Sequence, residues 1–148
     1  MKWLLDTNVI SEPIALRPDK KVVKWIESQP LEEVGISIVT SAELRDGATS
    51  VRDDFRRKRL TNWIESTISE EFRNHTLPVT TAILIDWIRL ARRLRTHGTP
   101  REPTDLLIAS TARVHNLILA SRNVKHFAGT GVVLYDPWSG KTHRMDAS

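Results

Sequence analysis

Trp3-Leu4-Leu5-Asp6-Thr7-Asn8 opens the chain with a short apolar run that stops at an acid. Three consecutive apolar residues followed by polar, turn-forming residues are typical of a short buried strand. Comparable apolar runs recur further along the chain, at 34–39, 117–120 and 132–135. A weaker candidate, Leu77-Pro78-Val79, fits only the edge of a sheet, because proline cannot donate to a central ladder. The sequence therefore predicts several short strands, the first of which ends at Asp6.

Amphipathic segments separate these strands. Asp19 is placed to cap a helix, and Thr40 is placed to open a short helix that runs to Leu44. Longer helices are expected over 51–72, from about 81 to Gly98, and over 103–115. Short apolar strands that alternate with helices are typical of a parallel sheet covered on both faces. The predicted fold class is thus α/β.

The size and composition of the chain limit its architecture. Its 148 residues are enough for one domain, which we expect over 1–138, followed by a short tail over 139–148. Apolar residues make up 40% and charged residues 27%, as in ordinary globular proteins. Without cysteine, a disulfide framework and a thiolate metal site are excluded. No apolar stretch reaches the roughly 20 residues of a membrane helix, so we expect no membrane contact and a cytoplasmic location.

The positive net charge of the chain weakly favours a polyanion as its partner. The 22 Lys and Arg exceed the 18 Asp and Glu by four, which makes nucleic acid the first partner to consider. The run Arg56-Arg57-Lys58-Arg59 has two interpretations, a solvated helix face or a surface for the RNA backbone. The five tryptophans lie mostly on apolar faces, which favours packing over base stacking.

Four polar residues lie where a parallel sheet binds ligands, just beyond strands or at helix starts: Asp6, Glu43, Asp105 and Asn123. Each acid alone also has a structural explanation. Asp6 can cap a helix, Glu43 completes a capping box with Thr40, and Asp105 lies at the positive end of a helix dipole. If the three acids converge, however, their repulsion needs a cation between them. Oxygen ligands select Mg²⁺ or Mn²⁺, and such an ion can activate water against a phosphodiester.

The same residues resemble a known family, the PIN-domain ribonucleases, and within it the VapC and FitB type of toxin from toxin-antitoxin systems. The resemblance rests on four stretches in order: 4–12, Ser41-Ala42-Glu43-Leu44, Asp105-Leu106-Leu107-Ile108-Ala109, and Ala120-Ser121-Arg122-Asn123. The ending Leu134-Tyr135-Asp136-Pro137-Trp138 also resembles the FitB type. The resemblance spans nearly the whole chain.

This resemblance implies a three-layer PIN-like fold with about five parallel strands. It implies Asp6, Glu43 and Asp105 as the ligands of Mg²⁺ or Mn²⁺ in an endoribonuclease, with Thr7 and Asn8 supporting the first carboxylate. The implied RNA targets are tRNA or ribosomal RNA. The implied partners are a second copy of the chain, a VapB- or FitA-like antitoxin, and promoter DNA through the antitoxin complex.

One position departs from the family pattern. Relatives often carry a fourth acid where this chain has Asn123 or, three residues on, His126. An amide can bind a metal or orient water but cannot serve as a general base, so we predict that Asn123 positions water. His126 is expected to be a surface or packing residue.

Two other functions fit the same sequence. A PIN fold with an imperfect fourth position could bind RNA or antitoxin without catalysis. A phosphatase of the haloacid-dehalogenase type would use Asp6 as a nucleophile, but it needs a second acid where Asn8 stands. Metal-dependent RNA cleavage would exclude the binding-only function, and hydrolysis of a generic phosphate ester that depends on Asp6 would favour the phosphatase.

Overall fold

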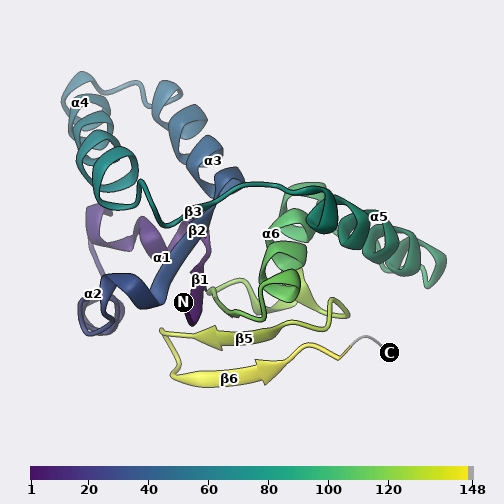
Figure 1. Cartoon of the computed structure of the whole chain (residues 1–148). Coiled ribbons are helices and arrows are strands. Elements are labelled where there is room, and N and C mark those ends of the chain that lie inside the picture. Colours follow the sequence, from purple (N-terminus) through teal and green to yellow (C-terminus); the bar gives the residue numbers. More distant parts are fainter. Residues whose placement is uncertain (147–148) are drawn as a thin grey trace.

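The computed structural model describes residues 1–146, which form a six-stranded sheet with helices on both faces (Figure 1). The strands are β1 (Trp3–Leu5), β2 (Val34–Ser37), β3 (Thr76–Leu77), β4 (Ile118–Ala120), β5 (Val133–Asp136) and β6 (Lys141–Arg144). Their order across the sheet is β3-β2-β1-β4-β5-β6. The first five strands are parallel to one another, which confirms the predicted parallel sheet. β6 pairs antiparallel with β5 and lies within the segment expected to be a tail.

The helices connect these strands and cover the sheet. They are α1 (Thr7–Ile10), η1 (Glu12–Ile14), α2 (Lys20–Glu27), η2 (Leu31–Glu33), α3 (Ile38–Thr49), α4 (Asp54–Trp63), η3 (Ile64–Glu71), α5 (Thr81–Thr96), α6 (Pro103–Val114) and η4 (Val124–Phe127). The helix predicted over 51–72 is therefore two elements, since α4 passes at Ile64 into the π-helix η3. Asp19 caps α2 as predicted, by accepting from the backbone amides of Lys21 and Val22.

The start of α3 corrects one sequence prediction. The second strand ends at Ser37, and the helix begins at Ile38 rather than at Thr40. Ser37 Oγ accepts from the Val39 amide at 3.1 Å and so caps the helix before Thr40 is reached. Thr40 is a buried residue inside the helix, and its capping box with Glu43 does not form. This leaves the Glu43 carboxylate for another partner.

Two apolar cores lie on opposite faces of the sheet, because neighbouring strand residues point to opposite sides. Trp3 and Leu5 face a core built with α1, α3 and η3, whereas Leu4 faces a core built with α5, α6 and η4. Figure 1 shows the pair α3 and α4 on one side of the molecule, and α5 with α6 on the other. The layers are thus helix, sheet and helix, as predicted.

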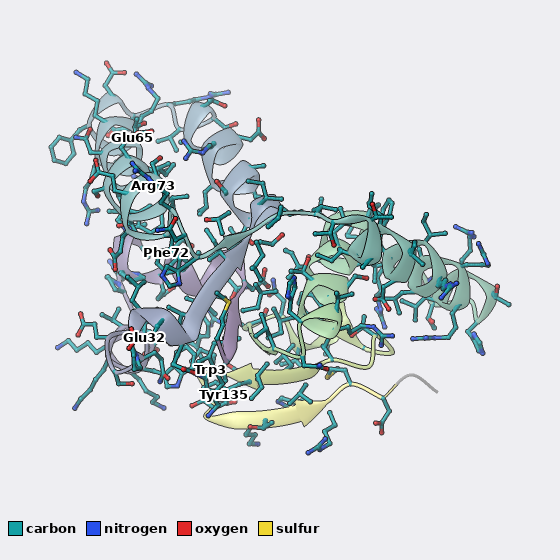
Figure 2. All side chains as sticks on the ribbon, viewed as in Figure 1. Trp3, Glu32, Glu65, Phe72, Arg73 and Tyr135 are labelled. Carbon is teal, nitrogen blue, oxygen red and sulfur yellow. The ribbon has the colours of Figure 1, made fainter. Side chains whose placement is uncertain are left out.

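Aromatic rings fix β1, α2 and β5 to one another. Trp3, Trp25 and Tyr135 pack with ring centroids 5.0 to 5.4 Å apart, and Figure 2 shows Trp3 beside Tyr135. The other tryptophans, Trp63, Trp87 and Trp138, also pack against the two cores. The prediction that the tryptophans serve packing is confirmed. None of the described helices has the length and apolar character that crossing a membrane requires.

Candidate functional site

The carboxyl ends of β1 and β4 meet at one edge of the sheet. The Asp6 amide donates to the Ala120 carbonyl at 2.9 Å, so the residues that follow these two strands lie side by side. The second turn of α3 carries Glu43, and the first turn of α6 carries Asp105. The parallel sheet therefore gathers four segments of the chain around one edge: the ends of β1 and β4, and the helices α3 and α6.

Asp6 is buried, only 4% exposed, and both oxygens of its carboxylate are held. Oδ1 accepts from the Thr7 amide at 2.8 Å. Oδ2 accepts from the Ser121 hydroxyl at 2.7 Å and from Asn8 Nδ2 at 3.2 Å. Burial raises the pKa of Asp6 above its ordinary value, and these three donors oppose that rise. Asp6 is also the N-cap of α1, so one residue both caps a helix and lies in the candidate site.

Glu43 faces this group from α3. Its Oε1 accepts from the Thr7 hydroxyl at 3.1 Å, so Thr7 links Asp6 through its amide and Glu43 through its side chain. Loss of water around the carboxyl raises the pKa of Glu43, the Thr7 bond lowers it, and the charges of Asp6 and Asp105 raise it further. The charges of both other acids therefore act on the Glu43 carboxyl.

Asp105 completes the group from α6 and is partly buried. Its Oδ2 lies 3.3 Å from His126 Nδ1, with side-chain exposures of 20% and 55% respectively. Burial and the charge of Asp6 raise the pKa of Asp105, whereas His126 lowers it. His126 is a surface residue, as expected, but it also contacts an acid of the site.

The three acids are thus within electrostatic range of one another. Within residues 1–146, however, no three carboxylate or imidazole groups are already arranged around a common metal position. The shared feature is raised pKa values, caused first by burial in all three acids; the charges of neighbouring acids raise the pKa further only for Glu43 and Asp105. Such a group gains most from a nearby cation.

Asn123 lies at the start of η4 and its side chain is exposed. Its backbone amide donates to Ser121 Oγ at 3.1 Å, which ties it to the hydroxyl that binds Asp6. Asn8 reaches the same segment, because its Oδ1 accepts from the Arg122 amide at 3.1 Å. Ser121 is the residue that sequence reasoning left without a role. The signal that identifies it is its position directly after β4, since polar residues at that point line the site edge of a parallel sheet.

Basic residues occur in two places, in the connection between β4 and η4 and in the basic run of α4. Arg122 extends from the β4–η4 connection and stacks its guanidinium 5.1 Å from the Trp138 ring centroid. In the basic run of α4, Arg57 pairs with Asp54 and donates to the Val51 carbonyl. The other three cations of that run, Arg56, Lys58 and Arg59, are exposed. Both interpretations of the run fit this exposure.

The chain is similar to known proteins in sequence and in structure. The chain matches the PIN domain over residues 3–131. Toxin FitB of Neisseria gonorrhoeae is 35% identical over 135 residues, which cover 91% of this chain and 97% of that protein. VapC ribonuclease Y4jK of Sinorhizobium fredii is 32% identical over 135 residues, which cover 91% and 96%.

Solved structures show the same likeness. FitAcB from Neisseria gonorrhoeae matches with a TM-score of 0.85 at 34% identity, over 92% of this chain and 98% of that chain. FitAB bound to an IR36 DNA fragment matches with a TM-score of 0.84 at 33% identity, over 92% and 95%. Because the domain match covers most of the sequence and the relatives align along nearly their full length, this chain belongs to the PIN-domain family.

Proposed function

We propose that the protein is the toxin of a toxin-antitoxin system and acts as an endoribonuclease that hydrolyses RNA phosphodiester bonds. The observation that carries this proposal is the placement of Asp6, Glu43 and Asp105 around the carboxyl edge of the sheet, where burial raises the pKa of each acid and the charge of Asp6 adds to the rise for the other two. The names of the relatives, a toxin and a VapC ribonuclease, give the reaction and the biological setting.

We further propose that the activity depends on Mg²⁺ or Mn²⁺ held by the three carboxylates. Hard oxygen donors are the ligands these ions prefer, and the positive charge of the ion would stabilise the ionised carboxylates, whose pKa values are raised first by burial and then, for Glu43 and Asp105, by neighbouring acids. When bound, the ion supplies a Lewis acid that lowers the pKa of water and neutralises charge on the phosphate. The donor set of this chain fits such an ion.

The other residues of the site hold the carboxylates and orient the attacking water. Ser121, Asn8 and the Thr7 amide hold both oxygens of Asp6 in a fixed direction. The Thr7 hydroxyl engages only Oε1 of Glu43. Asn123, whose amide side chain is exposed at the edge of this group, orients the attacking water. An amide carries no charge and cannot take the proton from that water.

RNA binding draws on the cations beside the site. The Arg122 guanidinium stacks on Trp138, and its backbone amide donates a hydrogen bond to Asn8, which itself donates to Asp6. A guanidinium is well suited to a phosphate, because its planar donors match phosphate oxygens. tRNA and ribosomal RNA are the candidate substrates, and both place the activity in the cytoplasm.

The proposed partners follow from the solved relatives. FitAB is described bound to DNA, and a VapBC2 complex from Rickettsia felis is described bound to a fragment of its promoter. We therefore propose a cognate VapB- or FitA-like antitoxin and promoter DNA contact through the antitoxin complex. The homodimer of this chain is proposed from the family resemblance.

The test is RNA cleavage by the purified chain without antitoxin. Total cellular RNA is incubated with Mg²⁺ or Mn²⁺, with EDTA, and with the Asp6→Asn and Glu43→Gln variants, and new RNA ends are sequenced. Asp46→Asn is the matched control, since Asp46 is an exposed acid on the same helix as Glu43. We expect discrete cuts that disappear with EDTA and with both site variants but persist in the control.

Other results point elsewhere. Cuts that survive both EDTA and Asp6→Asn would refute the site. RNA or antitoxin binding by folded protein without cleavage would favour a non-catalytic PIN fold. Asp6-dependent hydrolysis of a generic phosphate ester, without RNA cleavage, would favour a phosphatase.

A further inference from the structure

His126 is the one imidazole that contacts the group of acids within the described residues. It lies on η4, and the next residue, Phe127, is fully buried and anchors this short helix against the core shared with α6. The His126 amide donates to the Asn123 carbonyl at 3.0 Å, which fixes the backbone further. A fixed backbone with an exposed side chain presents the ring to the edge of the sheet.

The distance between His126 and Asp105 is that of two ligands on one ion. Donor atoms at neighbouring positions of an octahedral complex with bonds of about 2.1 Å stand about 3.0 Å apart. His126 Nδ1 lies 3.3 Å from Asp105 Oδ2, so an ion could bind both atoms with small side-chain movements.

We propose that His126 is a direct metal ligand, which adds a nitrogen to the three carboxylates and makes the site prefer Mn²⁺ over Mg²⁺. Nδ1 would bind the ion through its lone pair, as a neutral imidazole does. Imidazole suits transition metals, whereas Mg²⁺ favours oxygen donors and retains its waters. This inference rests on the proposed metal dependence and extends it to the identity of the ion.

The experiment uses Mn²⁺ itself as the probe and reads nitrogen coordination directly. Electron spin echo envelope modulation of Mn²⁺ bound to the full, untagged chain detects a coordinated ¹⁴N nucleus. The tag is omitted because it would supply further imidazoles. His126→Ala removes the ring at an exposed position, and His115→Ala is the matched control, since His115 is an exposed histidine at the far end of α6. Circular dichroism checks that each variant is folded.

We expect ¹⁴N modulation in the wild-type chain and in His115→Ala, its replacement by ¹⁵N signals after histidine labelling, and its loss in His126→Ala. We also expect His126→Ala to weaken Mn²⁺ binding about tenfold or more, and Mg²⁺ binding less. His126→Asp should restore Mg²⁺ binding but not the modulation.

Failure of this inference can be told apart from failure of the proposed function. If Mn²⁺ binds and Asp105→Asn abolishes binding, but no ¹⁴N modulation is seen, His126 is not a ligand and the carboxylate site stands. Modulation that persists in His126→Ala has the same meaning. If Mn²⁺ does not bind to the folded chain at all, the metal dependence and the inference both fail.

Discussion

Ser121 offers the sharpest test of how the site is held together. Its hydroxyl donates to the buried Asp6 carboxylate at 2.7 Å and accepts from the Asn123 amide at 3.1 Å. A hydrogen bond to a charged group contributes about 1.5–3 kcal/mol, and an ordinary one about 0.5–1.5 kcal/mol. Ser121→Ala should therefore lower the free energy of unfolding at neutral pH by about 2–4 kcal/mol.

Ser110 supplies a matched control. Both serines are fully buried, but Ser110 Oγ finds no hydrogen-bond partner among the described residues. Ser110→Ala removes the same hydroxyl without breaking a bond, so its effect should be close to zero or slightly stabilising. Any loss of packing is common to both variants and cancels in their difference.

Urea denaturation of the two variants at neutral pH, with EDTA present, measures this difference. A gap of about 2 kcal/mol or more is expected from the bonds that only Ser121 makes. The gap should narrow in acid, where Asp6 is protonated and its bond to Ser121 is no longer charge-assisted. Equal losses in the two variants would refute the role of Ser121 in stabilising the ionised Asp6.

Three further predictions concern pH, the ion pair between Asp86 of α5 and Arg113 of α6, and the packing of Trp3 on Tyr135. The acids of the site have raised pKa values in the folded chain, so the fold binds their protons more tightly than the unfolded chain, and they reduce stability as pH rises from their ordinary values of 3.8 and 4.5. Without metal, the free energy of unfolding of Asp6→Asn should therefore rise relative to that of the wild type as the pH goes from acid to neutral. Urea titrations at several pH values measure this difference, and a difference that shrinks as the pH rises would contradict the prediction. Asp86→Ala leaves the partly buried Arg113 guanidinium without its carboxylate at 3.0 Å, which should cost about 2 kcal/mol in chemical denaturation, less than the about 3–5 kcal/mol of a fully buried pair; a loss below about 0.5 kcal/mol would class it with surface pairs. Trp3→Ala removes a ring that packs on Tyr135 and should cost about 3–5 kcal/mol, seen as a lower Tm, whereas Trp3→Phe should cost clearly less; similar losses in both would show that ring packing is not the cause.

The sequence by itself determined the parallel α/β fold and the positions from which the acids approach. Short apolar runs ending in polar residues fix the strands, and parallel order brings the ends of β1 and β4 together. Asp6 and Asp105 follow from that pattern because each begins an element at the same edge. Local signals such as the Asp19 cap were also sufficient, because both partners lie within three residues.

Tertiary structure alone decided which groups hold the acids. For Glu43 the local pattern predicted a bond to Thr40, but Thr7, 36 residues away, is its partner, because the earlier cap at Ser37 places Thr40 inside the helix. Ser121 reaches Asp6 across 115 residues, and His126 meets Asp105 only because η4 packs beside α6. Strand pairing and helix docking set such contacts, and since they depend on distances between segments, no periodicity or spacing in the sequence encodes them.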